Sequence, residues 1–299
     1  MAQIPEIYAT TYANNVYMMA QQQGSLLYQH VTHIDMKGEM RTIERANPTA
    51  AQLVTSKLAD TPNGDGVKFD RRVLKADAYH WSDILDWTEE QGMNPIVDPT
   101  GPITRAGALA MGRCMDSIIV NNGLAGVAYT GKTGTTQVAL PDDQKIAVTY
   151  GGSSNSGLTL EKLLKARSIL GKSNIPLKGP GQECVMVITQ SQLDDLLKIS
   201  QIQSADYNTV RALVAGEVDT FLGFKFVVLD GSILPLSSGT RSCFAFLKSN
   251  VVFGEPQPLK SEINQRPDKC NAWQVYMKLK AGSTRYEDTG VVQIECEEA

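Results

Sequence analysis

The sequence predicts an α+β protein in which one long helix and several extended strands accompany a compact α/β unit. Three observations lead to this fold class. Apolar residues recur at helical spacing across Ile103–Asn122, which indicates a single helix of about twenty residues. Helical segments and buried strands alternate between about residues 125 and 250. Strand-like stretches rich in polar residues lie on both sides of these elements, within residues 31–90 and 251–299.

The chain begins with a polar segment. Residues 1–30 are rich in Gln, Asn, Tyr and Met, and the stretch ANNVYMMAQQQGSLL predicts a short helix ended by Gly24. Because its apolar side is too weak for independent stability, we expect this helix to lie across another surface.

The segment 31–90 contains two strand-like stretches, separated by the turn sequence DTPNGDG and polar on both faces. Such strands cannot cover a core, and an isolated two-stranded ribbon is marginal in water. We therefore expect the ribbon to lie on a neighbouring subunit. We predict contacts between subunits, where charge complementarity fixes register, for a group of charged residues close together in the sequence: Asp70, Arg71, Arg72, Lys75 and Asp77.

The long helix has clear boundaries. Pro102 suits a first helical turn, and Gly123 suits the end of a helix. Ala106, Gly107 and Ala110 are small and lie on one side, so we expect another backbone to approach the helix closely there.

Residues 125–250 carry the strongest local signals. Thr159 is a predicted N-cap for the helix TLEKLLKARSIL, and Thr189 with Gln192 forms a capping box for the next helix. The helix SADYNTVRALVAG is closed by Gly216. The stretches ECVMVIT, GFKFVVLD and TRSCFAFLK predict strands. The tail NAWQVYMKLKAGSTRYEDTGVVQIECEE predicts two half-buried strands around a turn.

One stretch, GVAYTGKT at Gly126–Thr133, matches the phosphate-binding P-loop pattern, and the strand FKFVVLD ends in Asp230 as a magnesium-binding strand would. A working P-loop enters a helix, whose N-terminal N–H groups and dipole hold the phosphate. Here a helix precedes the stretch, and GTTQVALPDD, a β or loop sequence, follows it. We interpret the stretch as a surface loop, with a nucleotide-binding enzyme as an alternative.

Other candidate chemistry is weak. In the stretch HVTH, His30 and His33 would point to opposite faces of a strand, so we expect no metal site there and none at His80. The sequence suggests no catalytic constellation and no cofactor. The net charge of −4 gives no sign of nucleic-acid recognition. We see neither a signal peptide nor a membrane span, and we expect a soluble protein made in a cytoplasm.

The order of these elements resembles that of the major capsid proteins of tailed bacteriophages, which share the HK-ninety-seven-like shell fold. The local strings that carry the resemblance run from about residue 8 to about residue 250 and include YANNVYMMAQQQGS, DTPNGDGVKFDRRV, YHWSDILDW, ALAMGRCMDSIIVNN, LTLEKLLKAR, SADYNTVRALVAGEVDTFLGFKF and LPLSSGTRSCFAF. No single string is specific to the family, but their order and spacing are.

The resemblance implies an N-terminal arm at residues 1–30 and an extended loop region at 31–90 that lies over a neighbouring subunit. It implies a peripheral domain with a spine helix, formed by residues 91–124 and 251–299, and an axial domain at 125–250. The implied function is a structural, non-enzymatic subunit of the virion. Such subunits assemble in the host bacterial cytoplasm into pentamers and hexamers of an icosahedral shell around double-stranded DNA.

The implied partners are other copies of the chain, a portal protein, and a separate scaffolding protein or a decoration protein. Packaged DNA would be contacted without sequence specificity, and no membrane would be involved. An encapsulin-like compartment shell has a related architecture and is the alternative within the same fold.

The five cysteines, Cys114, Cys184, Cys243, Cys270 and Cys296, are odd in number and widely spaced. Together with the lack of an export signal, this predicts five reduced thiols. Assembled particles should therefore run as monomers on a non-reducing gel. A ladder of disulfide-linked oligomers, formed without added oxidant, would contradict the prediction.

Overall fold

The computed structural model describes residues 24–47, 49–51, 53, 66–85, 102–131, 133–152, 154–172, 182–198 and 220–298. The helix predicted before Gly24 and the helix predicted to end at Gly216 lie outside these residues, as does nearly all of the turn DTPNGDG. Among the described helices, none combines the length and apolar character needed to cross a membrane.

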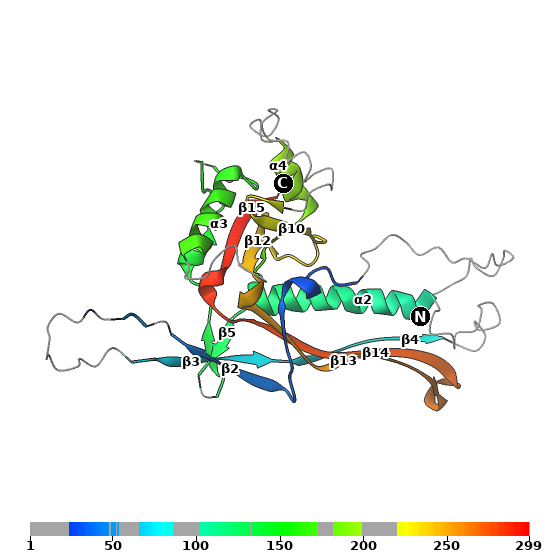
Figure 1. Ribbon diagram of the computed structural model, residues 1–299. Helices are drawn as coiled ribbons and strands as arrows, with labels where there is room; N and C mark the ends of the chain where they lie inside the picture. The colour runs from blue at the N-terminus through cyan, green and yellow to red at the C-terminus, as the bar shows by residue number, and fades with distance from the viewer. Residues whose placement is uncertain are drawn as a thin grey trace.

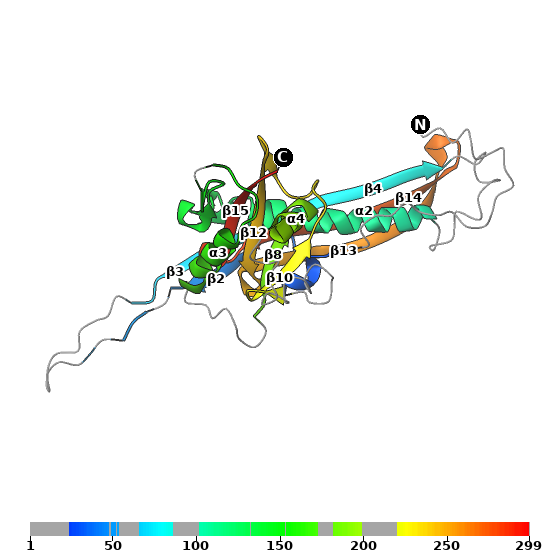
Figure 2. The same cartoon turned by 90° about the horizontal axis from the view of Figure 1, so that it is seen from above.

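The predicted long helix is α2, Pro102–Ile118, which continues into a π-helical turn, Ile119–Leu124. The wider turn is closed by the Ala125 N–H, which donates to the Val120 carbonyl at 2.8 Å. Figures 1 and 2 show α2 running along an elongated four-stranded sheet. In order across the sheet, the strands are β1 (Thr32–Ile34), β13 (Val251–Arg266), β14 (Ala272–Arg285) and β4 (Asp77–Leu85).

Small residues on α2 allow close approach, but not of a backbone at Gly107, where the sequence predicted one. A Cβ atom on Gly107 would lie 2.6 Å from two ring carbons of Trp81 on β4, so a side chain fills this position. The backbone approach occurs further along the helix, at Gly112, where a Cβ atom would lie 2.7 Å from the carbonyl carbon of Gly24. The N-terminal segment therefore crosses the helix at Gly112. Asp116 holds it there, accepting hydrogen bonds from the N–H groups of Leu26 and Leu27 at 3.0 Å.

A seven-stranded sheet forms the body above the long helix (Figure 1). In order, its strands are β7 (Lys145–Ile146), β15 (Val291–Glu297), β12 (Thr240–Leu247), β8 (Cys184–Ile188), β10 (Phe224–Val228) and β9 (Thr220–Phe221), with β11 (Leu236–Ser237) paired to β12. Two helices accompany it, α3 (Leu160–Lys172) and α4 (Gln190–Lys198). The parallel neighbours β8 and β10 are two of the predicted strands.

The predicted helix starts are confirmed. The backbone N–H of Lys162 donates to the Thr159 hydroxyl at 3.4 Å, and that of Leu163 to the Thr159 carbonyl at 3.2 Å. The Thr189 N–H donates to Gln192 Oε1 at 3.0 Å, which is the back-bond of a capping box.

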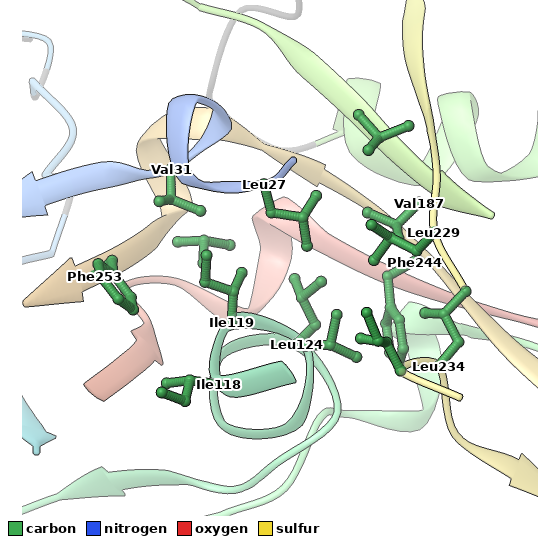
Figure 3. Packing of buried hydrophobic residues seen from close by; sticks show 14 of the residues in the cluster. Leu27, Val31, Ile118, Ile119, Leu124, Val187, Leu229, Leu234, Phe244 and Phe253 are labelled. Carbon is green, nitrogen blue, oxygen red and sulfur yellow. The ribbon is translucent and has the colours of Figure 1, made fainter. Parts of the chain in front are cut away.

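Alternating residues of the seven-stranded sheet enter two different cores. Met186 and Ala245 belong to the core beneath α3, with Leu163. Val187 and Phe244 face the other way, into the core that includes the π-helical turn. Figure 3 shows how Leu27, Val31, Ile119, Leu124, Val187, Phe244 and Phe253 converge in this second core. Because residues from both large sheets and the N-terminal segment share it, this core unites the body with the elongated sheet.

The third sheet has the strand order β2 (Met40–Ala46), β3 (Phe69–Lys75), β5 (Ala128–Thr130) and β6 (Thr136–Val138). Strands β2 and β3 form an antiparallel ribbon in which Met40 pairs with Lys75 and Ala46 with Phe69. The ribbon leaves the body at the end opposite the β13–β14 turn (Figures 1 and 2).

The tail forms the two predicted strands around a turn, β14 and β15, with the turn at Asp288–Gly290. The two strands lie in different sheets: β14 lies in the elongated sheet and β15 in the seven-stranded sheet, where Val292, Ile294 and Cys296 pack into the core beneath α3. Within residues 31–90, β1 and β4 are not part of the ribbon, since they pair with β13 and β14.

Gly282 on β14 provides a test of how the sheets meet. A Cβ atom there would lie 1.9 Å from the Lys75 carbonyl oxygen, at the turn from β3 into β4. Gly282→Ala should therefore lower the free energy of unfolding by about 3 kcal/mol, since backbone must move. Gly152→Ala, where the nearest atom is 3.8 Å away, is the matched control and should change little. Equal urea midpoints for the two variants would contradict the predicted contact.

Candidate functional site

Four of the five charged residues singled out from the sequence lie on β3, and the fifth, Asp77, begins β4. Successive residues of a strand point to opposite faces, so these charges divide between two environments. We call the face of the ribbon that carries Ile43, Arg45, Asp70 and Arg72 the inner face, and the face that carries Met40, Glu44, Phe69 and Arg71 the outer face.

The inner face is bound to its own chain. Arg72 is only 2% exposed and forms an ion pair with Asp288, which lies just after β14. Arg45 forms an ion pair with Asp70 across the ribbon, and its Nη1 donates to the Tyr286 carbonyl at 2.8 Å. The hydrogen bond from Arg45 holds the pKa of the Asp70 carboxyl below its usual range. Arg72 and Asp70 are therefore engaged within the subunit, whereas the sequence suggested contacts between subunits.

Asp288 also binds a second buried guanidinium. Arg285 is completely buried, and its Nε donates to Asp288 Oδ1 at 3.1 Å. Its Nη1 donates to the Leu124 carbonyl at 3.0 Å, and its Nη2 to the Val138 carbonyl at 3.2 Å. Burial lowers the pKa of Arg285, while the hydrogen bond that Arg285 donates to Asp288 opposes this change. We call Arg72, Arg285 and Asp288 the charged junction, because they connect the ribbon, the elongated sheet and the π-helical turn.

The outer face has two parts. Near the body, β5 pairs with β3 and continues the sheet, and Lys75 Nζ lies 3.5 Å from the ring centroid of Tyr129. Further out, Arg71 is 3.6 Å from Glu44; the Glu44 side chain is largely exposed and the Arg71 side chain is partly exposed. Asp77 is exposed at the start of β4.

The ribbon also exposes apolar side chains that the sequence analysis did not identify as functional. Phe69 is 77% exposed and Met40 is 48% exposed on the outer face. Strand β2 stands at the edge of its sheet, with β3 as its only hydrogen-bonded neighbour among the described strands. An edge strand with exposed aromatic and aliphatic side chains is a typical surface for pairing with another chain. In the sequence, the only available signal was the order FDRR at residues 69–72, in which Phe69 and Arg71 share one face of a strand and Asp70 and Arg72 the other.

The P-loop pattern has a different structure from a phosphate site. Its residues form the β5–β6 hairpin, with Gly131 and Gly134 at positive φ in the turn and the Gly134 N–H donating to the Gly131 carbonyl at 3.3 Å. Lys132 lies outside the described residues. The predicted surface loop is thus confirmed as a hairpin, and strand β6 follows where a P-loop needs a helix. Asp230 accepts a hydrogen bond from the Ser232 N–H at 2.8 Å, as in an ordinary turn.

The histidines have separate partners. His30 Nδ1 lies 3.1 Å from Glu183, while His33 Nε2 lies 2.8 Å from the Tyr28 carbonyl and His80 stacks on Tyr276. Within the described parts of the chain, no three His, Cys, Asp or Glu residues gather as metal ligands would.

All five cysteines are free thiols in the structure, with Cys184, Cys243 and Cys296 buried and Cys270 exposed. Burial raises the pKa of Cys184 to about 12, so this thiol is protonated at neutral pH and is a poor nucleophile.

Comparisons with known proteins agree with this architecture. A family model described as phage capsid protein matches residues 4–298. No curated protein sequence matches the chain. Among solved structures, the cyanophage Pam1 capsid asymmetric unit is similar with a TM-score of 0.69 and 10% identity, covering 100% of both chains. The Ralstonia phage GP4 capsid gives a TM-score of 0.67 and 11% identity over 100% of this chain and 98% of that one. A chain from Mycobacterium phage Che8 gives a TM-score of 0.64 and 17% identity, covering 95% of this chain and 96% of that one.

The fold is therefore the shell fold of phage capsids. The chain belongs to the phage capsid protein family, and it is a structural subunit of the shell of a virion.

Because one carboxylate pairs with both arginines of the charged junction, we predict that its removal strongly destabilises the fold. Asp288→Asn leaves two buried guanidiniums without their shared counter-ion, so it should lower the free energy of unfolding by about 3 kcal/mol. Glu44→Gln removes an exposed partner of Arg71 and should change little. Chemical denaturation of both variants checks this. Comparable midpoints would mean that the junction does not hold the sheets together.

Proposed function

We propose that this chain is the major capsid protein, which forms pentamers and hexamers of an icosahedral shell around double-stranded DNA in the host bacterial cytoplasm. The observation that carries the proposal, beside the family match, is the β2–β3 ribbon. Its inner face is fixed to its own subunit, while its outer face leaves an edge strand and Phe69 exposed. A surface of this kind is stabilised by a neighbouring copy.

The different contacts of the two faces of the ribbon support this role. The Arg72–Asp288 ion pair and the Arg45 contacts set the direction in which the ribbon leaves the body. The outer face then presents Phe69 and Arg71 at a fixed angle to the next subunit. An exposed ion pair contributes only about 0–1 kcal/mol, but every subunit of a shell repeats the contact.

The domain layout proposed for the shell follows the expectations with two changes. Residues 1–30 form the N-terminal arm, and the described part of the extended loop is the β2–β3 ribbon. The peripheral domain combines α2 with β1, β4, β13 and β14. The axial domain combines residues 125–250 with β15, since β15 lies between β7 and β12.

The proposed partners are further copies of the chain and a portal protein, with a scaffolding or decoration protein where the particle uses one. The mildly acidic chain, with a net charge of −4, suits an inner surface that encloses DNA without binding it tightly. The match to a phage capsid family favours a virion over an encapsulin-like compartment. A nucleotide-hydrolysing enzyme would need a helix N-terminus after the P-loop pattern to bind phosphate, and here the β5–β6 hairpin occupies that position.

The outer face gives a direct test. The double variant Phe69→Ser and Arg71→Glu changes two exposed side chains, so circular dichroism should show the native fold while sedimentation and electron microscopy show open or incomplete shells. The conservative pair Phe69→Leu and Arg71→Lys keeps the apolar and positive character and should close shells normally. If the first variant forms complete shells of normal stability, the outer face of the ribbon is not required for assembly.

A further inference from the structure

Three guanidinium groups meet where the inner face of the ribbon touches the body. Arg45 comes from β2, Arg72 from β3 and Arg285 from the end of β14. Two carboxylates, Asp70 and Asp288, are paired with them. Since arginine stays protonated, the cluster carries one positive charge more than its carboxylates neutralise.

The same cluster lacks hydrogen-bond acceptors. Arg72 Nε and Nη1 and Arg45 Nε are buried, and none of the three finds a partner among the described residues. Arg285, by contrast, uses all its nitrogens on Asp288 and backbone carbonyls. A buried donor without an acceptor is costly, and more so on a charged group. The unpartnered donors thus belong to Arg45 and Arg72, which lie on the same face of the ribbon.

The electrostatics point the same way. The pKa of Asp70 is held low mainly by its hydrogen bond from Arg45, with the charges of Arg45 and Arg72 adding to the effect. The pKa of Arg285 is lowered mainly by burial, Asp288 opposes the change, and the charge of Arg72 makes a smaller lowering contribution. The charge of Arg72 therefore acts on both neighbouring groups.

A ligand for this cluster must supply both an acceptor and negative charge. Water supplies acceptors without charge, whereas an oxyanion supplies both and forms short, charge-assisted hydrogen bonds with guanidinium groups. The margin of the cluster reaches solvent, because the side chains of Arg45 and Asp288 are each 16% exposed. The unpartnered nitrogens are themselves buried, so the side chain of Arg45 must shift to admit an ion to them. We propose that the pair Arg45 and Arg72 binds one small oxyanion of the phosphate or sulfate class, independently of shell assembly.

Such an ion would connect β2 and β3 at the base of the ribbon. Arg45 already holds the Tyr286 carbonyl, and Arg72 already holds Asp288. An anion shared by both arginines would fasten the ribbon to the turn after β14 more firmly. The ribbon's orientation would then respond to the phosphate concentration around the protein.

Equilibrium dialysis of the full-length chain against radiolabelled inorganic phosphate tests the site directly. We expect saturable binding of one phosphate per chain in the native protein. Arg45→Gln keeps the Arg72–Asp288 ion pair, and binding should weaken by about tenfold or more because one charged donor is lost. Arg71→Gln, on the outer face of the same ribbon, is the matched control and should bind as the native chain does.

Thermal unfolding gives a second readout. Phosphate stabilises many proteins by exclusion from their surface, and this effect raises the melting temperature of every variant alike. Specific binding adds a further rise, about 3 °C at ten times the Kd, relative to sodium chloride of equal ionic strength. The additional rise should occur in the native chain and in Arg71→Gln but not in Arg45→Gln. Absence of saturable binding, or equal binding by Arg45→Gln, would overturn the proposal and leave water as the occupant.

Discussion

The carboxylate of Asp288, shared by Arg72 and Arg285, is the interaction on which the meeting of the three sheets depends. A buried guanidinium is costly unless its donors are paired, and Arg285 pairs its nitrogens with Asp288 and with the backbone carbonyls of Leu124 and Val138. Each of these partners belongs to a different element. Because Arg285 binds them all at once, the end of the long helix and the β5–β6 hairpin are held in one relative position, and the Arg72–Asp288 ion pair adds the ribbon.

The apolar packing explains why this position is stable. The core shown in Figure 3 takes Phe244 from the seven-stranded sheet and Phe253 from the elongated sheet. Ile119 and Leu124 of the π-helical turn lie between them. Shape is therefore set by apolar burial in the centre and by charge pairing at the base of the ribbon.

The ribbon has an inner face that is fixed to its own subunit and an outer face that leaves apolar side chains exposed. On the inner face Arg72 is buried and paired, whereas on the outer face Phe69 is among the most exposed apolar residues of the described chain. In a monomer such an edge would be an aggregation hazard. In the shell we propose that another copy covers this surface, and the alternation of side chains along one strand places the fixed face and the exposed face on β3.

The site was only partly predictable. The cluster from Asp70 to Asp77 was visible because its charges are close in sequence. Arg45, Arg285 and Asp288 were not, since they lie far from Arg72 in the chain and are brought to it by the pairing of β2 with β3 and by the end of β14. Hydrogen bonds between residues so far apart in the sequence form only once the strands are in place, and the spacing of residues along the chain does not predict them.

By itself the sequence determined the elements whose signals are local: the apolar stripe of α2, the Thr159 cap, the Thr189–Gln192 capping box and the buried strand β8. Only the tertiary structure decided which sheet each strand joins. Strands β14 and β15 have similar half-buried patterns, yet one lies along α2 and the other beneath α3. The physical reason is that a two-residue alternation defines a buried face but not the surface that covers it. That choice depends on contacts between distant residues, such as Ile294 on β15 with the core under α3.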